Sequence, residues 1–237
     1  MGRYLVCVTD VRHAAYDIER ETLEKIGAEL LLSCLRQTAL RDRRIREGDW
    51  NIQGTGFRLA GKTLGLIGAG RIARALRRKV SGFGLREVVA CDPYVSAEKL
   101  DGLGMRKVEL DELLAVSDFV SLHLHANAET NGIINRSTLA KMKESAILIN
   151  VSRGALVNDE DLLDALRTHR ILAAGLDTHQ HEPLGKESPF CTLDNVLLTD
   201  HAAYSTLEGV RELKEKSARN IVDVLSGKQP QYRVSVP

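Results

Sequence analysis

The chain has 237 residues, of which 43% are hydrophobic and 27% are charged, and its net charge at pH 7 is +1. These values are typical of a soluble globular protein with one large domain or one and a half ordinary ones, and they give no reason to expect nucleic acid or an anionic membrane as a partner. No apolar run approaches the roughly 20 residues of a membrane span. The four cysteines are scattered, without a disulfide or zinc pattern. We therefore expect a cytoplasmic protein without a metal site.

The first quarter of the chain contains a short strand and a mostly helical region. Residues 3–9 are apolar and predict a buried strand, and residues 16–26 have helical spacing before a glycine. Residues 29–40 are ambiguous, because they fit either a second strand or the start of one long helix with a basic outer face. Residues 51–61 predict a loop.

A glycine motif organises the rest of the chain. Thr63 to Ile67 form a short apolar run that predicts a buried strand, and Gly-Ala-Gly-Arg-Ile-Ala follows at residues 68–73. A helical pattern comes next, and a second apolar run at residues 88–91 ends at Asp92. This order of strand, glycine turn, helix, strand and acid is typical of a dinucleotide-binding site.

Each position of the motif has a separate physical reason. Gly68 lets the chain turn tightly out of the strand, Gly70 lets the backbone approach a pyrophosphate, and Ala73 lets the helix pack closely on the strand. The helix N-terminus offers free N–H groups and a positive dipole end to the phosphates. Asp92 lies 22 residues after Gly70, where a carboxylate binds the ribose hydroxyls and repels a 2′-phosphate. The expected cofactor is therefore NAD.

The alternation of strands and helices continues after Asp92. The sequence predicts strands at residues 118–124, 146–150, 171–176 and 196–199, and helices at residues 110–116, 137–142, 158–169 and 207–225. Asn158 is a plausible N-cap for the third of these helices, with acids in the first turn. Such alternation predicts an α/β fold with a doubly wound parallel sheet, whose ligands bind beyond the carboxyl ends of the strands.

That rule selects an arginine, a glutamate and a histidine as candidate site residues. Arg153 follows the strand at residues 146–150, Glu182 follows the next strand, and His201 follows the last one. Arginine can hold a carboxylate with two parallel hydrogen bonds, and histidine can exchange the proton that accompanies a hydride. Taken singly, each has an ordinary explanation as a surface ion pair, a turn or a capping residue. Together, behind a dinucleotide motif, they favour catalysis.

Several stretches of the chain resemble the D-isomer-specific 2-hydroxyacid dehydrogenases. The matching pieces are LGLIGAGRIA, ACDPY, SLHLHANAETNGIIN, ILINVSRGALVNDEDLLDAL, AAGLDTHQHEP and LTDHAAYS. They extend almost continuously from Leu35 to Gly227. The resemblance implies transfer of a hydride between the nicotinamide of NAD and C2 of a small 2-hydroxy or 2-oxo acid. It also implies a homodimer formed through the cofactor domain.

The resemblance implies a role for each of a set of residues. Arg153 would anchor the substrate, His201 would be the acid/base, and Glu182 would be its partner. The implied cofactor contacts are Gly68, Gly70, Arg71, Ile72, Asp92, His123, Asn127, Val151, Ser152, Arg153, Asp177, His201 and Ala202.

Three departures from the family pattern leave alternatives open. Where the family usually has proline, leucine and threonine, residues 125–127 read His-Ala-Asn, and the resulting H-x-x-x-N form resembles the branch of C-terminal-binding proteins, which are NAD-sensing corepressors. The alternative function is therefore an NAD-responsive binding protein with vestigial catalysis. Asp200 replaces the proline that usually precedes the histidine. His179 and His181 flank the glutamate, but no cysteine or acid completes a zinc site with them and His125.

The substrate lobe that precedes the cofactor domain in the family is mostly missing from this sequence. The resemblance implies an NAD-binding domain at residues 34–204, with residues 1–33 and 205–237 as a remnant of a truncated, flavodoxin-like substrate lobe. A shortened lobe would close poorly over the site, so we expect cofactor binding to survive better than turnover. A deletion product without activity is a further alternative. The sequence does not identify the 2-hydroxy acid.

Overall fold

The computed structural model describes residues 28–50 and 56–231. The strand predicted at residues 3–9 and the helix predicted at residues 16–26 lie outside the described residues. The described residues divide into two compact units, one made of residues 28–50 and 56–203 and the other of residues 204–231. The predicted domain boundaries at residues 34 and 204 stay a prediction.

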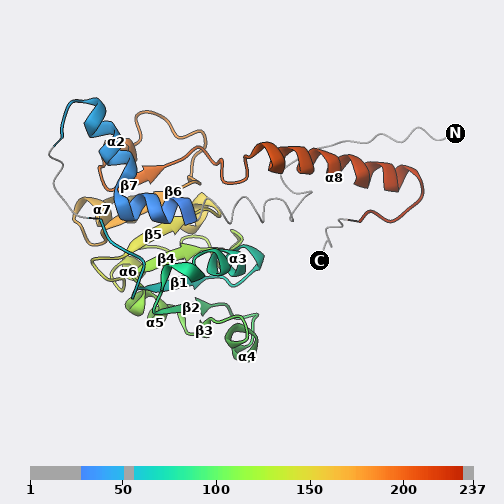
Figure 1. The fold of residues 1–237 in the computed structure, drawn as a ribbon, viewed down its shortest axis with the longest axis horizontal. Helices are drawn as coiled ribbons and strands as arrows, with labels where there is room; N and C mark the ends of the chain where they lie inside the picture. Colours follow the sequence, from blue (N-terminus) through green and yellow to red (C-terminus); the bar gives the residue numbers. More distant parts are fainter. Residues whose placement is uncertain (1–27, 51–55, 232–237) are drawn as a thin grey trace. The chain divides into compact units, whose positions relative to one another are not determined.

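The first unit contains one parallel sheet of seven strands (Figure 1), in the order β3-β2-β1-β4-β5-β6-β7. All neighbouring strands pair in parallel, so the predicted doubly wound fold is confirmed. The strand order reverses between β1 and β4, which is the place where ligands bind in such sheets. The strands are β1 (Thr63–Ile67), β2 (Glu87–Cys91), β3 (Arg106–Lys107), β4 (Phe119–Leu122), β5 (Ile147–Asn150), β6 (Ala173–Leu176) and β7 (Val196–Leu198).

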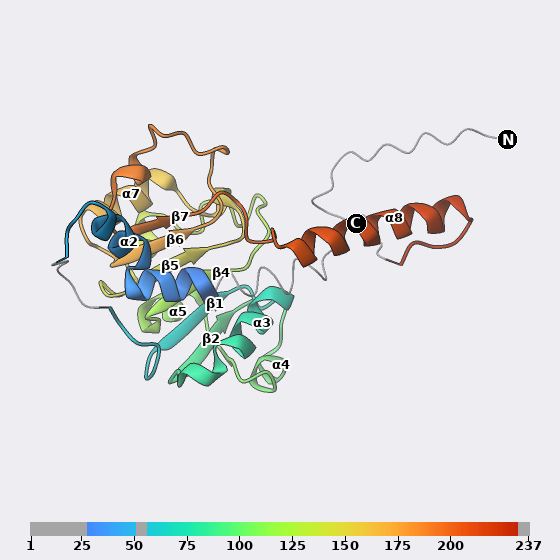
Figure 2. The ribbon, with the colours of Figure 1, turned by 45° about the horizontal axis from the view of Figure 1, so that its top comes forward.

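Helices cover both faces of this sheet (Figure 2). Successive strand residues point to opposite faces, so Leu64 and Leu66 join one apolar cluster while Ile67 joins the other. The first cluster also takes leucines from the helical residues 28–36, α3 and α4, and the second takes leucines from α5, α6 and α7. The helices of this unit are α2 (Thr38–Arg46), α3 (Arg71–Lys79), α4 (Ala97–Asp101), α5 (Leu110–Val116), α6 (Arg136–Leu139) and α7 (Asp159–Arg167), with short 3-10 helices η2 (Ser81–Phe83), η3 (Gly154–Leu156) and η4 (Pro189–Thr192).

Most predicted elements appear where the sequence placed them, but some boundaries and two elements differ. The Asn158 side chain accepts a hydrogen bond from the Asp161 amide and caps α7, as predicted. The strand predicted at residues 118–124 ends at Leu122, because its neighbours β1 and β5 end at the same level of the sheet. The helix predicted at residues 137–142 is a single turn, α6. The sequence did not predict α4 or β3, which are short.

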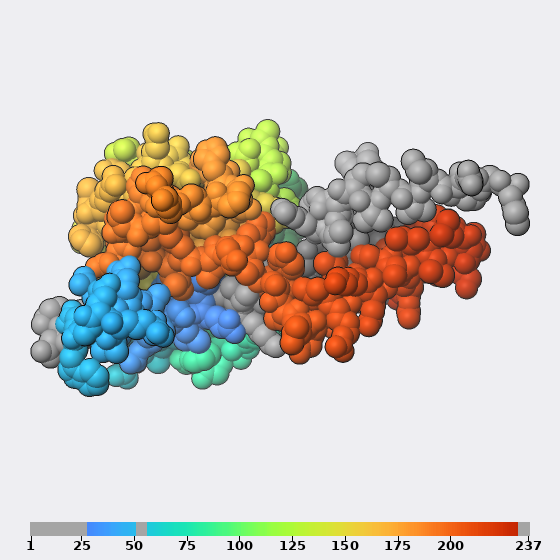
Figure 3. All heavy atoms as spheres, turned by 90° about the horizontal axis from the view of Figure 1, so that it is seen from above, coloured from blue at the N-terminus to red at the C-terminus, as the bar shows by residue number. Residues whose placement is uncertain are grey.

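The ambiguous region at residues 29–40 is helical, not a strand, but it is not one long helix. Residues 28–36 are helical, and α2 begins after a break at Gln37, which has a left-handed φ of 53°. Leu30, Leu31 and Leu35 are buried on the sheet, whereas α2 has no buried residue. Arg43 and Arg44 instead form ion pairs with Asp194, just before β7. Figure 3 shows α2 in light blue beside the orange segment around β7.

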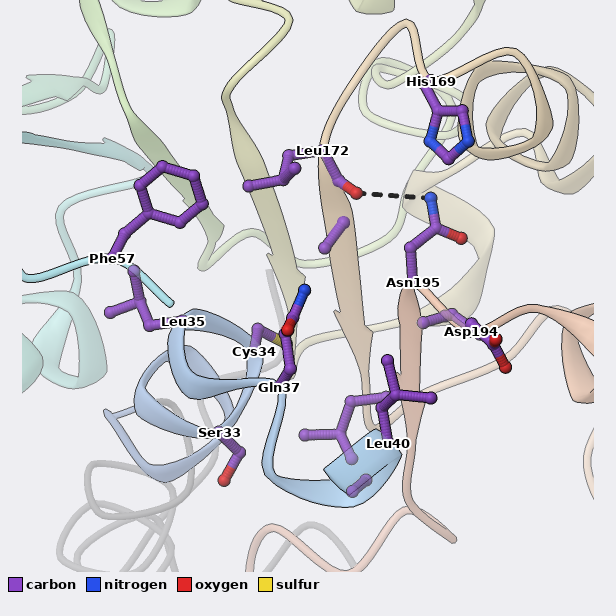
Figure 4. Close-up of a pocket in the computed structure, with 14 residues that line it drawn as sticks. Ser33, Cys34, Leu35, Gln37, Leu40, Phe57, His169, Leu172, Asp194 and Asn195 are labelled. Carbon is purple, nitrogen blue, oxygen red and sulfur yellow. Dashed lines mark hydrogen bonds between the residues drawn. The ribbon is translucent and has the colours of Figure 1, made fainter. Parts of the chain in front are cut away.

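A cavity of about 240 Å³ lies beside the break at Gln37. It is lined by Cys34, Leu35 and Leu40 on the helical side and by residues that precede or begin β6 and β7 (Figure 4). The Asn195 amide, on one side of the cavity, donates to the Leu172 carbonyl at 3.2 Å. Because these residues lie toward the N-terminal ends of the strands, the cavity is at the opposite end of β6 and β7 from the candidate active site described below.

The described part of the second unit consists mainly of the helix α8 (Leu207–Leu225), which has the predicted bounds. The Thr206 side chain caps it by accepting a hydrogen bond from the Gly209 amide. Neither α8 nor any other described helix has the length and apolar character needed to cross a membrane.

Candidate active site

The glycine turn after β1 has a backbone that only glycine can adopt. Gly68 has a φ of 90°, and a Cβ atom there would lie 2.5 Å from the carbonyl oxygen of His123. The Gly68 amide donates to the Cys91 carbonyl at 2.8 Å, which ties the turn to the end of β2. A side chain at this position would therefore push apart the ends of β1 and β4.

Gly70 presents the opposite situation, because the space where its side chain would be is empty. It is the N-cap of α3, and a Cβ atom there would have no neighbour within 4 Å. No side chain caps this helix, and its first turn contains no acid. The positive helix end therefore faces open space, which fits the pyrophosphate of a dinucleotide. Arg71 is exposed and Ile72 is half-buried at the start of the helix.

Asp92 braces the glycine turn through hydrogen bonds to its carboxylate. One carboxylate oxygen accepts a hydrogen bond from the Ala69 amide at 2.8 Å, and the other accepts from the Tyr94 amide at 2.9 Å. Each oxygen keeps a second lone pair, so the carboxylate can still accept from ribose hydroxyls. The carboxylate is therefore held in place before any ligand arrives.

His123 and Asn127 follow β4 and differ in environment. The Nε2 atom of His123 lies 2.9 Å from the Ser121 hydroxyl, and its Nδ1 atom is buried with no partner among the described residues. Burial lowers the pKa of His123 to about 4, so the ring is neutral at pH 7. Asn127 is exposed, and its side-chain oxygen accepts from the amides of Glu129 and Thr130. Asn127 therefore stabilises the turn in which it lies.

Arg153 lies on a turn that a buried asparagine holds. The Asn150 side chain donates to the Arg153 carbonyl at 2.9 Å and accepts from the Ser152 amide at 3.1 Å. The Ser152 hydroxyl donates to the Leu122 carbonyl at 2.6 Å, which joins the turn to β4, and Val151 is buried beneath it. The Arg153 side chain is exposed and pairs with no carboxylate among the described residues. Its guanidinium can therefore take an anionic ligand.

Glu182 and His201 are in direct contact, although 19 residues separate them. The Nδ1 atom of His201 lies 2.8 Å from a carboxylate oxygen of Glu182. A carboxylate accepts, so Nδ1 carries the proton, and a proton exchanged with a substrate would pass through the other ring nitrogen, Nε2. Burial raises the pKa of Glu182, but the hydrogen bonds from His201 and from the His179 amide outweigh it, so this pKa lies below its ordinary value. The pair has the arrangement of an oriented acid/base.

Asp177 holds the turn that carries His201. Its buried carboxylate accepts hydrogen bonds from the Thr199 hydroxyl at 2.6 Å, the Ala202 amide at 3.0 Å and the Ala203 amide at 3.1 Å. These three bonds surround His201, which has a φ of 55°. Asp177 therefore fixes the backbone on both sides of the histidine. Its predicted contact with the nicotinamide amide stays a prediction.

The structure places the predicted site residues at the carboxyl edge of the sheet, on the turns that follow β1, β2, β4, β5, β6 and β7, except that Arg71 and Ile72 begin the helix α3. Sequence reasoning missed the residues that support them. Asn150 was detectable as a polar residue at the end of an apolar strand. Gly154 and Thr199 carry no such signal, because their contacts are with residues distant in the sequence. Among the described residues, no group of three or more His, Cys, Asp or Glu side chains could hold a metal ion.

The chain is similar to known proteins over most of its length. The family model for the NAD-binding domain of D-isomer-specific 2-hydroxyacid dehydrogenases matches residues 28–203. The chain is 34% identical over 209 residues to D-3-phosphoglycerate dehydrogenase of Archaeoglobus fulgidus, covering 88% of this chain and 40% of that protein. It is 36% identical over 215 residues to glyoxylate reductase of Korarchaeum cryptofilum, covering 89% and 64%. It therefore spans less than two thirds of the length of either relative.

Solved structures show the same likeness. The crystal structure of D-lactate dehydrogenase with NAD+ from Lactobacillus jensenii superposes with a TM-score of 0.81 at 28% identity, covering 98% of this chain and 71% of that one. The TT0316 protein from Thermus thermophilus superposes with a TM-score of 0.87 at 33% identity, covering 94% and 70%. The chain therefore belongs to the D-isomer-specific 2-hydroxyacid dehydrogenase family, and residues 28–203 match its NAD-binding domain.

Proposed function

We propose that the protein is an NAD-dependent oxidoreductase that interconverts a small D-2-hydroxy acid and the corresponding 2-oxo acid. The observation that carries the proposal is the contact of 2.8 Å between His201 and Glu182, on the sheet edge that also holds the open glycine turn. The relatives named above are dehydrogenases and a reductase, which supports an enzyme over a binding protein.

The cofactor would be held by the turn after β1, with Gly70 and the α3 N-terminus at the pyrophosphate and Asp92 at the ribose. When bound, NAD supplies a nicotinamide ring that accepts or gives a hydride. The neutral, buried ring of His123 and the turn at Asn127 lie after β4, beside the strand that carries the glycine turn. They would form the wall of the cofactor site on that side.

The remaining residues would handle the substrate. Arg153 would grip the carboxylate of the acid with two parallel hydrogen bonds, which fixes C2 relative to the other groups. During oxidation, the Nε2 atom of His201 would take the proton of the C2 hydroxyl while the hydride leaves C2. Glu182 would stabilise the imidazolium that forms and keep the ring oriented. In the reverse direction His201 would return the proton to the oxo group.

A substrate panel tests this proposal. NADH consumption would be measured with pyruvate, glyoxylate and hydroxypyruvate, and NADH fluorescence in the same samples would report cofactor binding. We expect turnover with at least one of these acids and none with its amide, because the amide has no carboxylate for Arg153. Cofactor binding without turnover of any acid would contradict the proposal.

We also propose that the protein is a cytoplasmic homodimer. Ile45 in α2 and Trp50, shortly after this helix, are large apolar side chains that are exposed, with Trp50 82% exposed. Exposed apolar surface of this kind favours burial against a second copy. Light scattering coupled to gel filtration would give the mass in solution, and a monomer at micromolar concentration would contradict the dimer.

A further inference from the structure

We propose that His179 is a positioning residue for the Glu182–His201 pair. It is not needed to touch substrate or cofactor; its role is to join the two loops that carry the partners. The reaction that the pair serves rests on the proposed function, but the contacts of His179 do not depend on it.

His179 reaches both loops, one with its ring and one with its backbone. Its Nε2 atom lies 2.9 Å from the carbonyl oxygen of Thr199, at the end of β7. A carbonyl only accepts, so Nε2 carries a proton and donates it. The His179 amide donates to the second carboxylate oxygen of Glu182 at 2.9 Å. A single residue therefore fixes where Glu182 stands relative to the turn of His201.

The two partners differ in how much they need this support. His201 lies between residues that Asp177 already binds, so its backbone is held without His179. Glu182 lies on an exposed loop, and its side chain is 31% exposed. Among the described residues, the other hydrogen bond that holds its carboxylate, besides that from His201, comes from the His179 amide. An exposed carboxylate without such a partner samples several rotamers, which weakens its contact with the histidine.

Gly154 connects the same residue to the substrate anchor. A Cβ atom on Gly154 would lie 2.0 Å from the carbonyl carbon and oxygen of His179. The turn of Arg153 therefore packs directly on the peptide after His179. Because the ring of His179 is tied to Thr199, this peptide is a point where the loops after β5, β6 and β7 meet.

The test compares two substitutions of His179 in the full chain. His179→Gln keeps an N–H donor that can reach Thr199, whereas His179→Phe fills the space without a donor. The first readout is the NMR signal of the His201 Nδ1 proton, which a hydrogen bond to a carboxylate shifts downfield and protects from exchange. His201→Ala assigns the signal, because it removes that proton. The second readout is kcat and KM with the acid that the wild type turns over.

We expect His179→Phe to broaden or abolish the signal and to lower kcat about fivefold to tenfold, with little change in KM, because one neutral hydrogen bond is lost. His179→Gln should restore both. The matched control is His181→Phe, on the same loop, where the signal and kcat should not change. Should His179→Phe fail to fold, His179→Met makes the same comparison with a flexible side chain.

If His179→Phe left the NMR signal and kcat unchanged, the positioning role would be overturned. Losses in His181→Phe equal to those in His179→Phe would overturn it as well. The two proposals fail separately. A wild type without turnover contradicts the proposed function, whereas the NMR signal still decides whether His179 positions the pair.

Discussion

The glycine turn after β1 and the acid/base pair after β6 and β7 lie on the same edge of one sheet but are built differently. The turn is made of backbone, braced by Asp92, and the place of a Gly70 side chain is empty. The pair is made of side chains, and the place of a Gly154 side chain is filled by the peptide after His179. The glycine turn is therefore an open site, whereas the acid/base pair lies in a closed network of packed side chains and loops. The same substitution should therefore have opposite consequences in the two regions.

Gly154→Ala should lower stability and turnover together. Its Cβ atom would overlap the His179 backbone, so the loops after β5 and β6 must separate. We expect the free energy of unfolding to fall by about 1–3 kcal/mol, as for other overpacked sites, and turnover to fall with it. Urea unfolding and NADH consumption would measure both. Gly185→Ala is the control, because a Cβ atom there meets nothing within 4 Å; equal behaviour of the two variants would show that the network is not closed.

Gly70→Ala should act on the other region and leave the fold intact. Its Cβ atom would enter the space assigned to the pyrophosphate, so the Kd for NADH should rise at least about tenfold, equivalent to about 1.4 kcal/mol. Stability should change by less than about 1 kcal/mol, since the site tolerates the atom and only an N-cap preference is lost. Fluorescence titration would measure Kd. Gly82→Ala, also in open space, is the control, and an unchanged Kd in Gly70→Ala would place the cofactor elsewhere.

Asp118→Asn tests whether the sheet that supports both regions depends on a paired carboxylate. The Asp118 side chain is 11% exposed, accepts from the Thr63 amide at 2.9 Å and pairs with Lys143 at 3.2 Å. Burial raises the pKa of Asp118, but these partners and Lys62 outweigh it, so the pKa lies below its ordinary value. We expect the substitution to cost about 1–3 kcal/mol at pH 7.

The lowered pKa of Asp118 determines how its contribution to stability depends on pH. A depressed carboxyl pKa contributes stability above the unfolded value of about 3.9, and the contribution is lost as the pH falls through the folded value. The difference between wild type and Asp118→Asn in urea unfolding should therefore shrink below about pH 4. Asp111→Asn removes an exposed ion pair with Lys141 and should cost less than about 0.5 kcal/mol. A difference for Asp118→Asn that stays constant with pH would contradict the assignment.

The last comparison is between two cysteines, Cys34 in a buried part of the chain and Cys191 in an open part. Burial raises the pKa of the Cys34 thiol from 9.0 to about 12, whereas Cys191 is exposed on η4. At pH 8 the thiolate form of Cys34 is therefore much scarcer than that of an ordinary thiol. Iodoacetamide labelling with peptide mapping should modify Cys191 first. Comparable rates at Cys34 would show that the helix at residues 28–36 opens readily.

The sequence was sufficient to predict a parallel, doubly wound sheet and to name residues that follow its strands. The glycine motif and the periods of β1, α5 and α8 are local signals, and these elements appear with the predicted bounds. The break at Gln37 was not predictable, because a left-handed glutamine has no sequence signature and depends on how the two helical pieces pack. The ends of β4 and α6 are also set by neighbours in space.

The candidate site likewise has a part that the sequence predicts and a part that it does not. Arg153, Glu182 and His201 could be named because each follows a strand, and the rule of the carboxyl ends needs only chain order. The supporting contacts could not be named. Asp177 looks like a ligand-facing acid in the sequence, yet its carboxylate accepts three hydrogen bonds from the turn of His201, and that turn is more than 20 residues away. Such pairings depend on loop geometry that no spacing encodes.

The most direct test of the account is to measure NADH binding and 2-oxo acid turnover together in His201→Ala. The substitution removes the acid/base in the side-chain network and leaves the glycine turn untouched. We predict that turnover falls by about 10²- to 10⁴-fold, the usual contribution of general acid–base catalysis, while the Kd for NADH is little changed. Full turnover in this variant, or a parallel loss of NADH binding, would contradict the division between a cofactor region made of backbone and a catalytic region made of side chains.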